Sequence, residues 1–172
     1  MRFEDIKQFP QIYYHCDVPL NYVANSIKKY VKDYGLDMNP DFQRDYVWTQ
    51  QQKIKYIEYL LKNPTSGKEI YFNNPRWGKD WKGEFVIIDG KQRLNAVLEF
   101  LDNKVPAFGC LYKEFKGNFP SCICLSFNIG VLKTRKEVLQ WYLDFNTGGT
   151  YHTKKEIEKV IKLIQAEAEE EK

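Results

Sequence analysis

The length, composition and charge of the chain already limit what it can be. Its 172 residues, 43% of them hydrophobic, suit one compact domain with its own core and argue against wholesale disorder. A net charge of +3 is too small to indicate a nucleic-acid partner by itself.

The first predicted elements are a helix and an extended segment. Apolar residues recur at helical spacing over residues 23–34, and Gly35 follows as a helix-ending glycine. Residues 36–48 contain Pro40, which favours extended backbone before it. In a regular strand, alternate residues of this segment would share one buried face: Phe42, Arg44, Tyr46 and Trp48.

A second helix and two strands are predicted next. Thr49 can cap a helix that the pair Asn63-Pro64 would end. Residues 68–72 and 84–88 are short runs typical of β-strands. The stretch between these runs is rich in turn-forming residues, which predicts a long hairpin or a mobile loop.

The C-terminal half predicts three more helices and further strands. Asp89-Gly90 predicts a sharp turn into a third helix, and residues 105–128 predict two or three short strands. A fourth helix would be capped by Thr134 and broken at Gly148-Gly149. The last helix is expected to begin near Thr153 and to fray into an acidic tail over residues 165–172. Its predicted apolar face comprises Ile157, Val160, Ile161 and Ile164.

These elements together predict an α+β fold, with a small mixed sheet, flanking helices and a C-terminal helix. No internal repeat and no linker divides the sequence, so we expect residues 1–172 to form a single domain.

The segment around the third helix has the features of a phosphate site. An apolar strand ends at Asp89, Gly90 turns the chain, and a helix begins at once, so that unpaired amides and the helix dipole favour an anion. Lys91 and Arg93 add positive charge, and Gln92 adds a neutral donor. Gly90 would let a ligand approach the backbone. Asp89 is expected to orient Arg93 or to hold a metal ion beside phosphates. An ordinary turn with solvated cations is the alternative.

Two other segments could complete such a site. Gln43 and Arg44 lie between aromatic residues, and Arg44 could clamp a phosphate; the alternative is a surface ion pair of Arg44 with Asp41 or Asp45. The second segment joins a helix end to two glycines, which can form an anion-binding nest or an ordinary helix C-cap. Its residues are Asn146, Thr147, Gly148 and Gly149.

The basic and aromatic loop at residues 73–83 indicates a second kind of partner. Cations there alternate with tryptophans, a pattern that can track nucleic-acid phosphates and stack on bases. The residues concerned are Arg76, Trp77, Lys79, Trp81 and Lys82. The alternative is a loop folded onto its own protein through the two tryptophans.

The cysteines and histidines do not predict a metal site or a nucleophilic enzyme. None of the four cysteines belongs to a set of Cys and His pairs with zinc-ligand spacing. We expect reduced core thiols in a cytoplasmic protein, since no signal peptide opens the sequence and no apolar run reaches membrane-spanning length.

Three ordered motifs resemble a known family. FQRDYVW, IIDGKQRLNAVLEFL and FNTGGT are similar to the DGQQR-motif domain of the ParB/sulfiredoxin-like superfamily, which forms the N-terminal part of GmrSD-type modification-dependent restriction enzymes. The resemblance covers about residues 18–160. It implies a ParB-like fold whose strand-to-helix turn binds a nucleoside triphosphate with Mg²⁺. The residues carried over by position are Gln43, Arg44, Asp89, Gly90, Gln92, Arg93, Asn146, Thr147, Gly148 and Gly149.

Two departures from the family pattern qualify what the resemblance implies. Lys91 stands where the family has a Gln, and its charge could tighten phosphate binding. Restriction relatives also carry an HNH-type nuclease, whereas only His15 and His152 occur here. We therefore do not expect nuclease activity of that kind from this chain.

Three functions remain open at this point. The first is an NTP-binding domain linked to restriction or counter-defence, with weak metal-dependent NTPase activity in which Asp89 and Arg93 would be catalytic. The second is a DNA-binding or DNA-nicking ParB-like protein that uses the loop at residues 73–83. The third is a non-catalytic decoy or nucleotide-sequestering protein that would contact a nuclease or another defence-system protein.

Overall fold

The computed structural model of this chain describes residues 2–6, 10–147 and 154–170. Its centre is a mixed four-stranded sheet in the order β1-β4-β2-β3. The strands are β1 (Tyr14–Pro19), β2 (Glu69–Asn73), β3 (Val86–Asp89) and β4 (Cys124–Gly130). β4 pairs antiparallel with β1 and parallel with β2, while β3 pairs antiparallel with β2 at one edge of the sheet.

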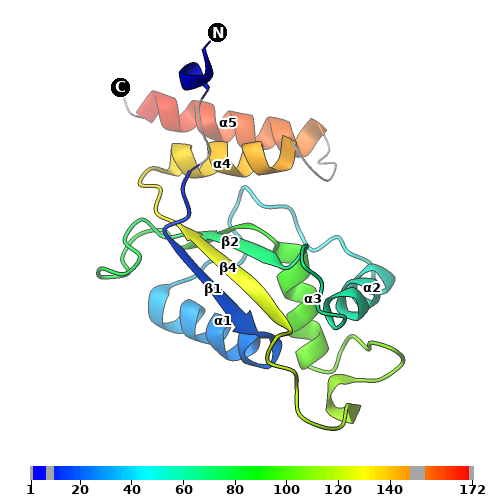
Figure 1. The fold of residues 1–172 in the computed structure, drawn as a ribbon. Helices are drawn as coiled ribbons and strands as arrows, with labels where there is room; N and C mark the ends of the chain where they lie inside the picture. Colours follow the sequence, from blue (N-terminus) through cyan, green and yellow to red (C-terminus); the bar gives the residue numbers. More distant parts are fainter. Residues whose placement is uncertain (1, 7–9, 148–153, 171–172) are drawn as a thin grey trace.

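Helices pack on both faces of this sheet (Figure 1). The helices are α1 (Leu20–Tyr34), α2 (Gln50–Leu60), α3 (Lys91–Leu101), α4 (Arg135–Thr147) and α5 (Lys154–Glu170). Because side chains alternate along a strand, the sheet divides two cores. Ile87 belongs to the core shared with α1 and α3, whereas its neighbours Val86 and Ile88 belong to the core shared with α4 and α5. The predicted α+β class, with a mixed sheet and a C-terminal helix, is confirmed.

Local signals explain where two of the helices begin and end. Gly35 adopts φ of 69°, and its amide donates to the Tyr30 carbonyl at the end of α1. The Thr49 hydroxyl accepts from the Gln52 amide, and the Gln52 side chain accepts from the Thr49 amide, which together form a capping box for α2.

The alternating buried face expected in residues 36–48 is absent, and only one of the two or three strands expected in residues 105–128 forms. Residues 41–43 form a turn, so no alternating buried face exists, and Tyr46 is 44% exposed. Within residues 105–128 a short 3-10 helix, Tyr112–Glu114, precedes β4, which is the only strand there. Tyr112 and Phe115 from this stretch pack against Phe100 at the end of α3 instead of lying in a ladder of strands.

The C-terminal helix also differs from its prediction. Ile157, Val160 and Ile164 pack in the core shared with α4 and α5, but Ile161 is 41% exposed. α5 continues as far as Glu170 instead of fraying from residue 165. One reason is an ion pair between Glu167 and Arg135, which ties the acidic end of α5 to the start of α4.

Across the described ranges, every helix is too short or too polar to cross a membrane.

Candidate functional site

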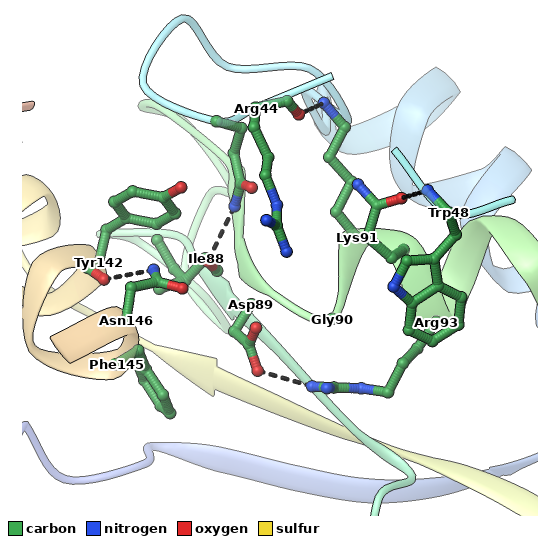
Figure 2. A pocket seen from close by; sticks show the side chains of 12 residues that line it. Arg44, Trp48, Ile88, Asp89, Gly90, Lys91, Arg93, Tyr142, Phe145 and Asn146 are labelled. Atoms are coloured by element: carbon green, nitrogen blue, oxygen red, sulfur yellow. Dashed lines mark hydrogen bonds and ion pairs between the residues drawn. The ribbon is translucent and has the colours of Figure 1, made fainter. Parts of the chain in front are cut away.

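A cavity opens where the end of β3, the start of α3, the segment around Arg44 and the end of α4 meet (Figure 2). Its volume of about 290 Å³ lies near the lower end of the range for ligand pockets. The lining combines polar motif residues with three aromatic side chains. The lining residues are Gln43, Arg44, Trp48, Ile88, Asp89, Gly90, Lys91, Gln92, Arg93, Tyr142, Phe145 and Asn146.

Gly90 shapes the floor of this cavity, and close packing gives a second reason for a glycine there, while its expected role in ligand approach stays a prediction. Its φ is 92°, and a Cβ placed there would lie 2.6 Å from Ile70 Cδ1 and 3.1 Å from the Glu69 carbonyl oxygen. The glycine is therefore required by close packing on β2. As the N-cap of α3 it supplies no side-chain hydrogen bond, and the first helical bond runs from the Leu94 amide to the Gly90 carbonyl. The first-turn amides keep their capacity to bind an anion.

Arg44 contributes a positive charge to the cavity. Figure 2 shows its guanidinium reaching from the segment above into the space over Gly90. The alternative of an ion pair with Asp41 does not hold, because Asp41 pairs with Arg135 at 2.5 Å. Within the described part of the chain, no ion pair of 4 Å or less involves the Arg44 guanidinium. It is therefore the cation best placed to meet a ligand.

Asp89 and Arg93 form an ion pair at one edge of the cavity. Arg93 Nη2 lies 2.6 Å from Asp89 Oδ2, and the Nε and Nη2 of Arg93 also donate to the Glu69 carbonyl. The guanidinium is thus fixed between β2 and β3, and Asp89 orients Arg93 as expected from the sequence. Figure 2 shows the other oxygen of Asp89 directed toward the cavity.

Lys91 and Gln92 line the cavity, but their polar ends bind protein. Lys91 Nζ donates to the Arg44 carbonyl at 2.8 Å. Gln92 Oε1 accepts from the amides of Val47 and Trp48, and its Nε2 donates to the Asp45 carbonyl at 2.8 Å. Both side chains are buried. Their expected donation to phosphate stays a prediction, in competition with these contacts.

Gln43 likewise binds backbone. Its Nε2 donates to the carbonyls of Ile87 and Ile88 at 3.1 and 2.8 Å. β3 lies at an edge of the sheet, and Gln43 supplies a hydrogen-bond donor near the end of this edge strand. Gln43 therefore anchors its own segment beside the cavity.

The third predicted motif is described only in part. Asn146 lies in α4, where its Nδ2 donates to the Tyr142 carbonyl at 2.6 Å, and Figure 2 shows its side-chain oxygen facing the cavity. Thr147 is the last residue of α4. The Thr147 side chain, Gly148 and Gly149 lie outside the described residues.

Three aromatic residues complete the lining and were not expected there. Trp48 lies on the side of the cavity opposite Tyr142 and Phe145 (Figure 2). Burial raises the pKa of the Tyr142 hydroxyl to about 12, and the nearby charge of Arg44 opposes this rise. Tyr142 is buried on the inner face of α4 and Phe145 is partly buried there, but no periodicity in the sequence shows that this face also borders a cavity.

The loop at residues 73–83 is folded back on the protein through its tryptophans. Trp77 is 6% exposed and belongs to the core shared with α1 and α3. Trp81 stacks on Tyr34 with ring centroids 4.5 Å apart. Arg76 pairs with Asp80 at 2.5 Å. Base stacking on Trp77 would therefore need the loop to leave the core. DNA binding through Lys79 and Lys82 stays a prediction.

The fold and cavity define an α+β domain with a small polar pocket at a strand-to-helix turn. Among protein families, the model for the GmrSD restriction endonuclease, N-terminal domain, matches residues 24–172. This match covers most of the chain, so the chain belongs to that family. No curated protein and no solved structure matched. The family resemblance expected from the three motifs is confirmed, while the sulfiredoxin-like fold stays a prediction.

Proposed function

We propose that the cavity binds the phosphate groups of a nucleoside triphosphate. The observation that carries this proposal is the Arg44 guanidinium, which enters the cavity without an ion-pair partner among the described residues, beside the uncapped first turn of α3. A guanidinium can bind a phosphate through two parallel hydrogen bonds, and helix-terminal amides add donors at the same place. The cavity volume of about 290 Å³ suits the phosphate chain. The base would then lie near the aromatic lining residues Trp48, Tyr142 and Phe145.

Mg²⁺ would fit this arrangement as part of the bound nucleotide. The cation prefers oxygen ligands, and nucleotide sites usually supply one or two carboxylates beside the phosphates. The oxygens of Asp89 and Asn146 that face the cavity are suitable donors. Within the described residues no cluster of three His, Cys, Asp or Glu could hold a metal ion by itself. Bound Mg²⁺ would neutralise charge that develops on the phosphates.

Slow hydrolysis is the reaction that such a site would support. A water oxygen bonds to the γ-phosphorus while the bond to the β–γ bridging oxygen breaks, and a nucleoside diphosphate, phosphate and a proton are released. Positioned charge supplies most of the catalysis in this chemistry. Arg44 would stabilise the phosphate oxygens, and Asp89, held by Arg93 at 2.6 Å, would orient water or metal.

The chain belongs to the GmrSD N-terminal family, which supports a restriction-related role for the proposed activity. We place the chain as a nucleotide-binding component of a restriction-related system, acting for defence or counter-defence. A non-catalytic variant of the same role would sequester the nucleotide. Tight binding without phosphate release would favour sequestration over turnover.

The test is binding and phosphate release with each of the four common NTPs and Mg²⁺. A bound nucleotide at about a hundredfold its Kd should stabilise the protein by about 2.7 kcal/mol in thermal shift. Arg44→Ala should weaken binding by about 1.5–3 kcal/mol, the value of a charge-assisted hydrogen bond. Arg76→Ala removes the same charge from an exposed ion pair outside the cavity and serves as the matched control. If no NTP shifts the melting curve, or if both variants bind like wild type, the proposal is wrong.

A further inference from the structure

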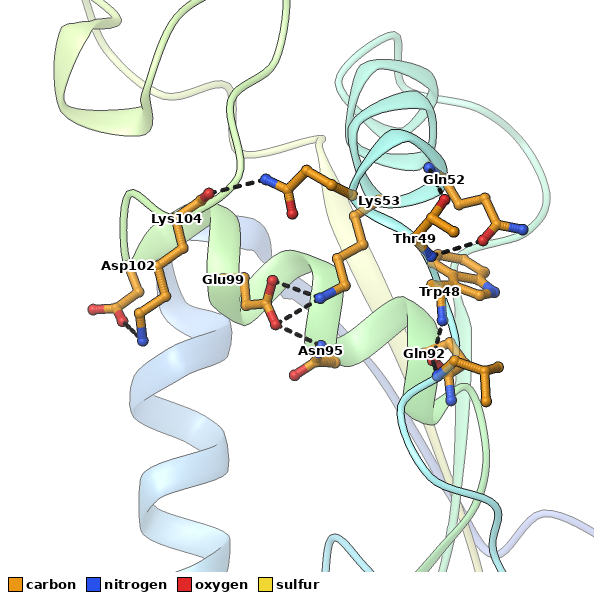
Figure 3. Close-up of polar contacts among 11 residues, drawn as sticks. Trp48, Thr49, Gln52, Lys53, Gln92, Asn95, Glu99, Asp102 and Lys104 are labelled. Atoms are coloured by element: carbon orange, nitrogen blue, oxygen red, sulfur yellow. Dashed lines mark hydrogen bonds and ion pairs between the residues drawn. The ribbon is translucent and has the colours of Figure 1, made fainter.

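The segment of residues 44–48, here called the strap, crosses one side of the cavity and is anchored at both ends. Before it, the Gln43 side chain bonds to the β3 carbonyls of Ile87 and Ile88. After it, Thr49 caps α2, and α2 is fixed to α3 by Lys53 Nζ, which lies 2.8 Å from both carboxylate oxygens of Glu99 (Figure 3). The two anchors leave five residues between them whose position decides where the Arg44 side chain points.

The strap itself is held by side chains and not by a backbone ladder. Across the ranges that the structure describes, no backbone-to-backbone hydrogen bond involves residues 44–48. Gln92 instead makes three bonds to it, through the Val47 amide, the Trp48 amide and the Asp45 carbonyl. Figure 3 shows the bond from Trp48 to Gln92 at the start of α3. The Gln92 side chain thus makes hydrogen bonds to the strap backbone that a neighbouring strand would otherwise make.

Lys91 holds the first residue of the strap. Its ammonium donates to the Arg44 carbonyl at 2.8 Å and lies 4.8 Å from the centroid of the Tyr46 ring, a distance typical of a cation–π contact. The residue is 4% exposed, and burial lowers the pKa of the ammonium, an effect that the Asp45 and Asp37 carboxylates oppose. Moving this ammonium to a phosphate would leave the Arg44 carbonyl without its partner, which is costly in a partly buried setting.

We propose that Lys91 and Gln92 are positioning residues, which hold the strap so that the Arg44 guanidinium enters the cavity, and that neither side chain is a phosphate ligand. This inference rests on the proposed function in one respect. Of the side chains of Arg44, Lys91 and Gln92, only that of Arg44 is assigned to the bound phosphate. The inference also explains why two polar side chains next to an anion site are 4% and 7% exposed.

A double-mutant cycle on nucleotide affinity separates positioning from direct contact. Lys91→Met keeps the length of the side chain and removes its donor. We expect Lys91→Met to weaken NTP binding about tenfold in the wild-type background, but less than about twofold in the Arg44→Ala background. Equal losses in both backgrounds would show that Lys91 contacts phosphate directly and would overturn the proposal. Lys104→Met, an exposed residue paired with Asp102, controls for the loss of one positive charge.

Hydrogen exchange without any ligand tests the strap independently of nucleotide binding. In Gln92→Ala the amides of Val47 and Trp48 lose their acceptor and should exchange at least about tenfold faster, while the amides of α1 stay unchanged. Unchanged rates at Val47 and Trp48 would refute the role of Gln92. If Gln92→Ala does not fold, Lys91→Met supplies the same readout over residues 45–48. If wild type binds no NTP, the proposed function fails, and the exchange rates still decide whether Lys91 and Gln92 hold the strap.

Discussion

Replacing Gly90 with alanine tests whether packing on β2 fixes the turn that begins α3. Two costs combine in this variant. An L-residue at φ of 92° is strained by about 1–2 kcal/mol. The added Cβ would also meet Ile70 Cδ1 at 2.6 Å and the Glu69 carbonyl at 3.1 Å, and overpacking of this kind costs about 1–3 kcal/mol. We expect Gly90→Ala to lower the free energy of unfolding by about 2–5 kcal/mol in urea denaturation.

Gly117 provides a matched control for this prediction. Its φ is 91°, but nothing lies within 4 Å of the position that a Cβ would occupy. Gly117→Ala should therefore show the backbone strain alone, about 1–2 kcal/mol. Ile70→Val removes the atom in closest contact and should recover part of the loss when combined with Gly90→Ala. Equal destabilisation by Gly90→Ala and Gly117→Ala would refute the packing argument.

Three further outcomes are expected. Burial raises the pKa of the Tyr142 hydroxyl from 10.0 to about 12, so the folded state favours the neutral phenol and loses stability, on the order of 2 kcal/mol, as pH rises through that window. Tyr142→Phe should reduce this fall in denaturant titrations below and above about pH 10, and an equal fall in both proteins would contradict the assignment. Thr49→Ala removes the acceptor of the Gln52 amide at 3.3 Å and should cost about 1 kcal/mol of unfolding free energy; no change in urea midpoint would show that the cap is dispensable. Asp89→Asn should weaken NTP binding more with Mg²⁺ than without it in calorimetric titrations, whereas an equal loss under both conditions would show that Asp89 does not act through the metal.

Elements with local signals could be predicted from the sequence. Helical spacing before Gly35 and the capping box at Thr49 depend on residues only a few positions apart, and both helices are present. β1 was not predicted, because it exists through pairing with β4, as between Tyr14 and Ile129. The strands expected in residues 105–128 were wrong for a related reason. Aromatic residues fit a strand in isolation, but Tyr112 and Phe115 pack on Phe100 at the end of α3.

The sequence predicted which motif residues meet at the candidate site better than it predicted which groups their side chains bind. The motifs around Gln43 and Asp89 lie far apart in the sequence, and the structure brings them to one cavity. The residue types already indicated a cation beside a helix start, which is where Arg44 lies. The partners of Lys91 and Gln92 could not be predicted, because they depend on which carbonyls and amides of the strap face α3. The tertiary fold decides which backbone groups of the strap face α3, and no periodic pattern in the sequence indicates them.

The central claim is that Arg44 and the start of α3 bind nucleotide phosphate. A crystal structure of the chain with a non-hydrolysable NTP analogue and Mg²⁺ tests it most directly. The account predicts phosphate oxygens within hydrogen-bond distance of the Arg44 guanidinium and of the first-turn amides of α3, with Lys91 still bonded to the Arg44 carbonyl. An analogue bound elsewhere on the protein, or phosphates bound to Lys91 with Arg44 turned away, would contradict it.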